Sequence, residues 1–159
     1  MELYLGVDIG GTSCKIGSVN TEGKLLNQKE YSVNFDKYVT PILDTVIDSV
    51  RDFLKTYPND YRGIGVSATG QIDTSKGEVI GTAGHIDNYI GSKIKSSLEQ
   101  EFNLFTTCAN DANCMLLGEQ WQGKAKGYSD VIGITIGTGV GGGILVNHQI
   151  LEGNIGIGG

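Results

Sequence analysis

Apolar runs separated by polar turns near the N-terminus predict three consecutive strands. The first run, residues 3–7, leads into Asp8, and a glycine pair then turns the chain before a second run at residues 15–19. A polar turn around Gly23 precedes a third run at residues 25–33. This pattern predicts a meander of three antiparallel strands, with a carboxylate entering its first turn and hydroxyl groups at the tip. Glycines in that turn would allow positive φ angles and close approach of a ligand to the backbone.

Apolar residues spaced three and four apart predict helices further along the chain. The pattern is clearest over residues 36–57, where Val39 begins the buried face and Pro41 lies in the first turn. Shorter helices are predicted over residues 92–102 and 110–121, and short strands over residues 64–68, 78–80 and 104–109. Because strands alternate with helices, we expect an α/β fold, a mixed sheet with helices on its faces.

A second hairpin with a glycine-rich turn is predicted near the end of the sequence. Strands at residues 131–136 and 143–146 enclose a run that matches G-x-G-x-x-G at Gly137, Gly139 and Gly142. A dinucleotide-binding fold needs a helix directly after this motif, whereas an apolar strand follows here. A phosphate cradle made by backbone N–H groups and the Thr138 hydroxyl remains. The polar connection at residues 123–129 is the best domain boundary, which gives domains at 1–122 and 123–159.

Composition excludes several classes of protein. The 159 residues include 25 glycines, carry a net charge of −6 and contain no Lys/Arg cluster, so no nucleic-acid partner is expected. No apolar run is long enough to cross a membrane, and no signal peptide is apparent. The three cysteines are odd in number and lack metal-site spacing. We interpret them as reduced, packed thiols of a cytoplasmic protein.

Three polar residues are candidates for chemistry, and each has a structural alternative. The two phosphate cradles suggest that the protein binds the two ends of one triphosphate. Asp8 would then hold Mg²⁺ through water, or its carboxylate would instead accept hydrogen bonds from N–H groups of its own turn. Asp111 lies between a predicted strand and a predicted helix. It would accept a proton from a substrate hydroxyl, cap the helix, or do both. His85 is a loop histidine that is either solvated or a ligand.

Four motifs in this order resemble the ROK family of bacterial sugar kinases and related transcriptional repressors. They are the stretches GVDIGGT at 6–12 followed by Lys15, GQID at 70–73, NDAN at 110–113 and GTGVGGG at 137–143. The resemblance covers essentially the whole chain. It implies an actin-like ATPase (ribonuclease H-like) domain and ATP-dependent phosphorylation of a hexose or related sugar, a transferase activity of carbohydrate metabolism.

The resemblance also implies roles for individual residues. Residues that match the nucleotide phosphate loops are Asp8, Gly10, Gly11, Thr12, Lys15, Thr138 and Gly139, with Mg²⁺ near Asp8. Asp111 matches the catalytic base. Residues expected around the sugar are Gly70, His85, Asn110 and Asp111. We expect ATP and Mg²⁺ as cofactors, a small sugar as partner, and a homo-oligomer of the parent protein.

The sequence departs from the family pattern at three places. Thr69 stands where members usually have proline, and His85 aligns where many have a sugar-binding asparagine. The chain also stops before the Glu-x-Gly-His segment that binds sugar in the family. We therefore expect an N-terminal portion of a kinase that is inactive alone and whose last hairpin pairs with another chain or with the first lobe. The alternatives are a non-catalytic nucleotide- or sugar-binding regulatory module and a relative that acts on acyl phosphates or another acceptor.

Overall fold

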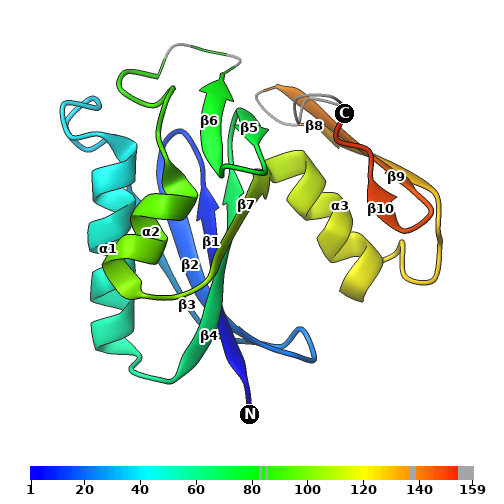
Figure 1. Cartoon of the computed structure of the whole chain (residues 1–159), viewed down its shortest axis with the longest axis horizontal. Coiled ribbons are helices and arrows are strands. Elements are labelled where there is room, and N and C mark those ends of the chain that lie inside the picture. Colours follow the sequence, from blue (N-terminus) through cyan, green and yellow to red (C-terminus); the bar gives the residue numbers. More distant parts are fainter. Residues whose placement is uncertain (83, 85, 137–138, 154–159) are drawn as a thin grey trace.

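The computed structural model contains, in the residues that it describes, one large mixed sheet, a three-stranded sheet, a two-stranded sheet and three helices (Figure 1). It describes residues 1–82, 84, 86–136 and 139–153. In the described chain the elements run in the order β1 Leu3–Ile9, β2 Ser13–Asn20, β3 Leu25–Ser32, α1 Ile42–Thr56, β4 Tyr61–Ala68, β5 Gln71–Asp73, β6 Glu78–Gly81, α2 Ile94–Phe102, β7 Thr106–Asn110, α3 Asp111–Gln122, β8 Val131–Ile136, β9 Val140–Val146 and β10 Gln149–Ile150.

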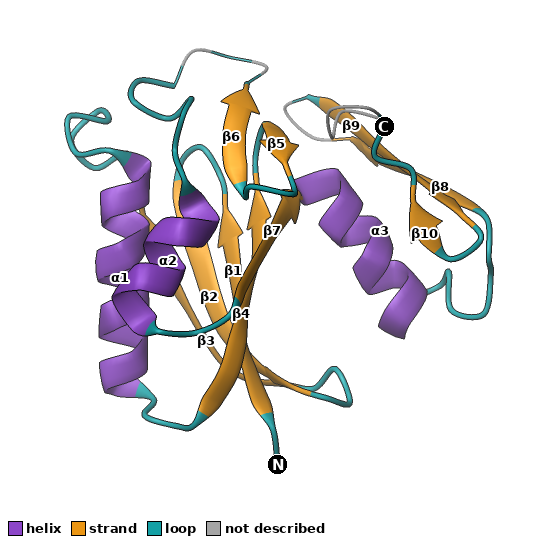
Figure 2. Cartoon of the chain, viewed as in Figure 1, coloured by secondary structure: helices purple, strands orange, loops and turns teal. Residues whose placement is uncertain are grey.

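The large sheet has the strand order β3-β2-β1-β4-β7. Its first three strands form the predicted antiparallel meander, whereas β1, β4 and β7 run parallel to one another. The α/β class with a mixed sheet is therefore confirmed. Because parallel strands end at the same edge, the carboxyl ends of β1, β4 and β7 meet beside the small β5–β6 hairpin (Figure 2).

Alternation along β1 directs one set of side chains into the core. Leu3, Leu5, Val7 and Ile9 are at most 6% exposed, whereas Tyr4 and Asp8 point to the opposite face. The buried set belongs to one core that includes residues of α1 and α2. Both helices lie on the same side of the sheet, and α3 lies on the other side, between the sheet and β8–β10 (Figure 1).

The start of α1 differs from the sequence expectation. The helix begins at Ile42, Pro41 is its N-cap with an extended ψ of 142°, and Val39 is 79% exposed instead of buried. A proline disfavours the helical conformation at the residue before it, so Thr40 cannot join the helix. Residues 36–40 form a separate turn, in which the Asp36 carboxylate accepts bonds from the backbone N–H and the hydroxyl of Thr40.

The second strand of the late hairpin begins earlier than expected. Strand β9 starts at Val140, so Gly141 and Gly143 lie within the strand and not in the turn. A Cβ atom at Gly141 would lie 2.6 Å from Oγ1 of Thr135, and one at Gly143 would lie 3.0 Å from Oδ1 of Asn113. These glycines therefore allow β9 to pack closely against β8 and α3.

The described chain bears on two further predictions from the sequence, one on membrane-spanning segments and one on the domain boundary. No helix in the described ranges combines the length and apolarity required to span a membrane. The division into domains at residue 122 stays a prediction, because α3 contacts both β7 of the large sheet and β9 of the small one.

Candidate functional site

The described part of the candidate site is built at the carboxyl edge of the parallel strands. One cavity of about 530 Å³ opens there, and its lining includes Asp8 near the end of β1 and Gly10 after it, Ser67 in β4 and Thr69 after it, and Asp111 at the start of α3. Thr135 of β8 closes the other side. Residues far apart in the sequence thus place two carboxylates and three hydroxyl groups around one space. Ligands of open α/β sheets generally bind at this kind of edge.

A larger cavity of about 1020 Å³ lies between the sheet and α3. Asp8 and Ser67 line it as well, and so does Lys15, but Asp111 does not. Its remaining lining includes glycines of the sheet and apolar side chains such as Leu117 and Trp121. Because the smaller cavity holds both carboxylates, we assign the reactive chemistry to it.

The carboxylate of Asp8 is exposed and held by one neighbouring side chain. The hydroxyl of Ser67 donates a 2.8 Å bond to its Oδ1. Asp8 stands between Lys15 of β2 and Ser67 of β4 in the sheet register, so the three form a row across the strands. Sequence reasoning missed Ser67, although its position at the end of a strand beside Asp8 was a possible signal.

The turn between β1 and β2 presents unused backbone donors. The N–H of Gly10 donates to the carbonyl of Ser13 at 2.9 Å, but the described residues provide no acceptor for the N–H groups of Gly11 and Thr12. Neither Gly10 nor Gly11 has a positive φ, so the turn does not use the conformational freedom that glycine allows. A Cβ at Gly10 would lie 3.2 Å from the Ser13 carbonyl, so close backbone packing favours glycine there.

Asn110, and not Asp111, caps α3. Its Oδ1 accepts bonds from the N–H groups of Ala112 and Asn113, and its Nδ2 donates to the carbonyl of Gly70 at 2.7 Å. Asp111 is the first residue of the helix and is exposed. Its Oδ1 accepts from the N–H of Ala112 at 2.8 Å, while Oδ2 has no hydrogen-bond partner in the described ranges. One carboxylate oxygen is therefore free to act on a ligand.

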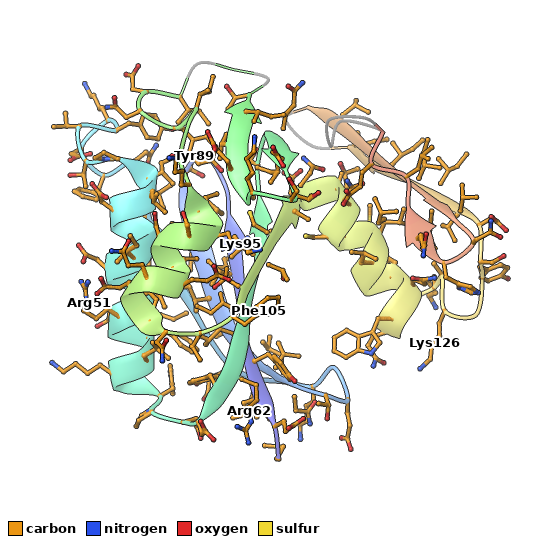
Figure 3. All side chains as sticks on the ribbon, viewed as in Figure 1. Arg51, Arg62, Tyr89, Lys95, Phe105 and Lys126 are labelled. Atoms are coloured by element: carbon orange, nitrogen blue, oxygen red, sulfur yellow. The ribbon has the colours of Figure 1, made fainter. Side chains whose placement is uncertain are left out.

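Gly70 has a conformation that requires glycine. Its φ is +96°, and a Cβ there would lie 2.6 Å from the carbonyl of Gly81. The preceding Thr69 is fixed by the Tyr89 hydroxyl, which donates to its carbonyl at 3.0 Å. Figure 3 places Tyr89 at the β5–β6 end of the molecule and Arg62 at the opposite end. The turn after β4 is thus held by a buried aromatic side chain.

The remaining candidates divide into described and undescribed residues. Gly139 precedes β9, and a Cβ there would meet no atom within 4 Å among the described residues. His85 and Thr138 lie outside the described residues. No cluster of three or more His, Cys, Asp or Glu side chains suited to a metal occurs in the described chain. Two carboxylates line the cavity; of these, Asp111 is the predicted base, and Asp8 fits Mg²⁺ held largely by water and phosphate oxygens.

Cys14 and Cys108 are buried, Cys114 is partly buried, and none of the three thiols is poised for reaction. Burial raises the pKa of Cys14 and of Cys108 to about 12, and that of Cys114 to about 11. Such thiols stay protonated at neutral pH and are poor nucleophiles. This agrees with the expectation that they serve packing, including Cys114, which lines the smaller cavity.

The chain is similar in sequence to known proteins. The ROK family model matches residues 4–159. The chain is 38% identical to a beta-glucoside kinase of Klebsiella pneumoniae, covering 92% of this chain and 47% of the relative. It is 36% identical to a glucokinase of Halalkalibacterium halodurans, covering 98% and 48%. The chain spans about half the length of these curated relatives.

A solved structure shows the same architecture. It is that of a ROK family glucokinase from Streptomyces griseus in complex with glucose and AMPPNP, with a TM-score of 0.83 and 30% identity. The alignment covers 98% of this chain and 48% of that one. The expected actin-like ATPase fold is confirmed by this similarity.

Proposed function

Because the chain belongs to the ROK family, we propose that it carries the phosphate-binding and base residues of an ATP-dependent kinase for a hexose or related sugar. The observation that supports this most directly is the single 530 Å³ cavity lined by Asp8, Gly10 and Asp111. The relatives named glucokinase and beta-glucoside kinase favour a sugar hydroxyl as acceptor.

The turn at residues 10–12 would bind the nucleotide phosphates. The N–H groups of Gly11 and Thr12, which find no acceptor among the described residues, are suited to anionic oxygens, and the Thr12 hydroxyl adds a donor. Lys15, in register with Asp8, would contribute positive charge beside the turn. We assign Thr138 and Gly139 to the opposite side of the phosphates.

Asp111 would act as the general base. Its free Oδ2 accepts the proton of the sugar hydroxyl while the hydroxyl oxygen forms its bond to the γ-phosphorus. The bond from that phosphorus to the bridging oxygen breaks, and ADP leaves with the electron pair. The sugar hydroxyl would be oriented by Asp111 in the cavity, by Asn110, whose side chain is bonded to Gly70, and by His85.

Mg²⁺ is the metal that best fits this arrangement. The carboxylate of Asp8 would hold it through water, and the ion would neutralise charge on the phosphates. Ser67 fixes one oxygen of that carboxylate and leaves the other available. The second carboxylate of the cavity, that of Asp111, is assigned to the base, so the ion would be bound mainly by Asp8 through water and by the substrate.

A coupled assay of ADP release tests the proposal. The purified chain, and the longest protein that its gene encodes, would be supplied with MgATP and a panel containing glucose, other hexoses and a β-glucoside. We expect sugar-dependent ADP release by at least one of the two proteins, and Asp111→Asn should lower its rate by roughly 10²- to 10⁴-fold. ATP binding without sugar-dependent turnover in either protein would instead support the non-catalytic binding module. Turnover with acetate but with no sugar would support an acyl-phosphate enzyme.

A further inference from the structure

The segment between β3 and α1 has an unusual backbone. Two consecutive non-glycine residues, Lys37 with φ +59° and Tyr38 with φ +65°, adopt the left-handed conformation. Side chains rarely adopt this conformation, and it persists only where surrounding contacts enforce it. Here two hydrogen bonds from Thr40 to the Asp36 carboxylate close the turn locally. The Tyr38 ring is partly buried and packs against the core.

This backbone delivers the Tyr38 hydroxyl to the glycine turn between β1 and β2. It donates a 2.7 Å hydrogen bond to the carbonyl of Gly11. The same segment provides a second bond, from the N–H of Val33 to the carbonyl of Thr12 at 3.0 Å. Two consecutive carbonyl groups of the turn are therefore fixed by the segment that leads into α1.

Fixing a carbonyl also fixes the donor of the same peptide unit. The carbonyl of Gly11 and the N–H of Thr12 belong to one planar peptide, in which they point in opposite directions when the bond is trans. The chain contains no cis peptide among its described bonds. A Gly11 carbonyl bonded to Tyr38 thus directs the Thr12 N–H away from the 33–41 segment. That N–H has no acceptor among the described residues.

We propose that Tyr38 is a positioning residue of the phosphate turn, which holds the Gly11–Thr12 peptide so that its N–H stays directed at an anionic oxygen of the ligand. The inference rests on the proposed function, in which this turn binds phosphate. Without the hydroxyl, the peptide can rotate. Part of the free energy of phosphate binding would then be used to order the Gly11–Thr12 peptide.

The test compares two variants that each lose one tyrosine hydroxyl. Tyr38→Phe removes the bond to Gly11 and keeps the ring. Tyr61→Phe is the matched control, because the Tyr61 hydroxyl donates a similar bond, 2.9 Å, to the carbonyl of Tyr57 at the far end of the sheet. Binding of ATP and of inorganic tripolyphosphate would be measured by calorimetry. The Thr12 amide resonance would be followed by NMR in the same titrations.

We expect Tyr38→Phe to weaken tripolyphosphate and ATP binding about fivefold or more, which is on the order of 1 kcal/mol. It should also reduce the ligand-induced shift of the Thr12 amide, whereas Tyr61→Phe should behave as wild type. Equal affinities and equal Thr12 shifts in wild type and Tyr38→Phe would overturn the role of Tyr38 alone. A wild-type protein that binds neither ligand would overturn the proposed function, and the role of Tyr38 with it.

Discussion

The hydroxyl of Ser67 donates a 2.8 Å hydrogen bond to Oδ1 of Asp8, across neighbouring parallel strands. The bond leaves Oδ2 as the oxygen available to a hydrated metal. Residues that orient a metal-binding group typically affect metal affinity by about 10- to 100-fold when mutated. Because the metal would be held through water here, we expect an effect at the lower end of that range.

Ser67→Ala should raise the Mg²⁺ concentration that gives half-maximal ATP binding by about tenfold. Calorimetric ATP titrations at a series of Mg²⁺ concentrations measure this. Ser67→Thr retains the hydroxyl and serves as the control. An unchanged Mg²⁺ dependence in Ser67→Ala would show that this bond does not orient the metal-binding carboxylate.

Asp111→Asn should lower kcat by roughly 10²- to 10⁴-fold in any protein that carries this site and shows turnover, because the amide cannot accept the hydroxyl proton. Its oxygen can still accept the bond from the Ala112 N–H, so ATP affinity should stay nearly constant. Steady-state kinetics and ATP titrations separate the two effects. Asp44→Asn, an exposed position in the first turn of α1, is the control. Normal kcat in Asp111→Asn would remove Asp111 from this role.

Gly11→Val should abolish nucleotide binding without unfolding the protein. The Cβ at this position would meet only Ile86 Cδ1, at 3.8 Å among the described atoms, but the branched side chain would stand where phosphate must approach the backbone. Thermal unfolding should therefore change little, and the sugar site should be mostly retained. Gly84→Val, at an open position, is the matched control. Unchanged ATP affinity in a folded Gly11→Val protein would contradict the assignment of this turn.

The free energy of unfolding should fall as the pH rises above about 8.5. Unfolded thiols ionise near that value, whereas burial raises the pKa of Cys14 and Cys108 to about 12 in the folded state. The unfolded state then binds fewer protons than the native state, so each thiol lowers stability by up to about 1.4 kcal/mol per pH unit.

Urea denaturation at pH 8 and pH 10 tests this for Cys14. Cys14→Ala retains every other titratable group, so the difference between the two proteins reports mainly this thiol. The loss of stability between the two pH values should be smaller in Cys14→Ala. The same loss in both proteins would mean that Cys14 ionises as easily in the folded state as in the unfolded one.

The outer face of β8 should promote self-association of the chain. Its side chains Ile132, Ile134 and Ile136 are 75%, 65% and 86% exposed, and β8 pairs only with β9 among the described strands. Exposed apolar edge strands are a common cause of association. Ile134→Lys should reduce the association seen by sedimentation velocity over a concentration series, whereas Ile90→Lys, on a distant loop and 61% exposed, should not. A wild-type chain that stays monomeric at high concentration would argue against this.

Local sequence signals predicted most of the secondary structure. Apolar runs bounded by polar turns identified β1, β2 and β3. The three-and-four spacing identified α1 and α2, because this spacing reflects which face of a helix is buried. The misses arose where backbone context overrides the pattern. Pro41 excluded Thr40 from α1. Asn110 holds the N-cap position of α3, which was one of the two roles left open for Asp111. The glycines of β9 serve packing against Thr135 and α3, which a glycine count cannot reveal.

The sequence by itself determined the chemical groups that are present and the elements that carry them, since both follow from residue type and local spacing. Only the tertiary structure decided which groups meet. Ser67 lies 59 residues from Asp8, and Tyr38 lies 27 residues from Gly11, yet each pair is hydrogen-bonded. Strand register brings the first pair together, and two left-handed residues bring the second. Register and backbone strain depend on contacts between distant segments, which local spacing does not encode.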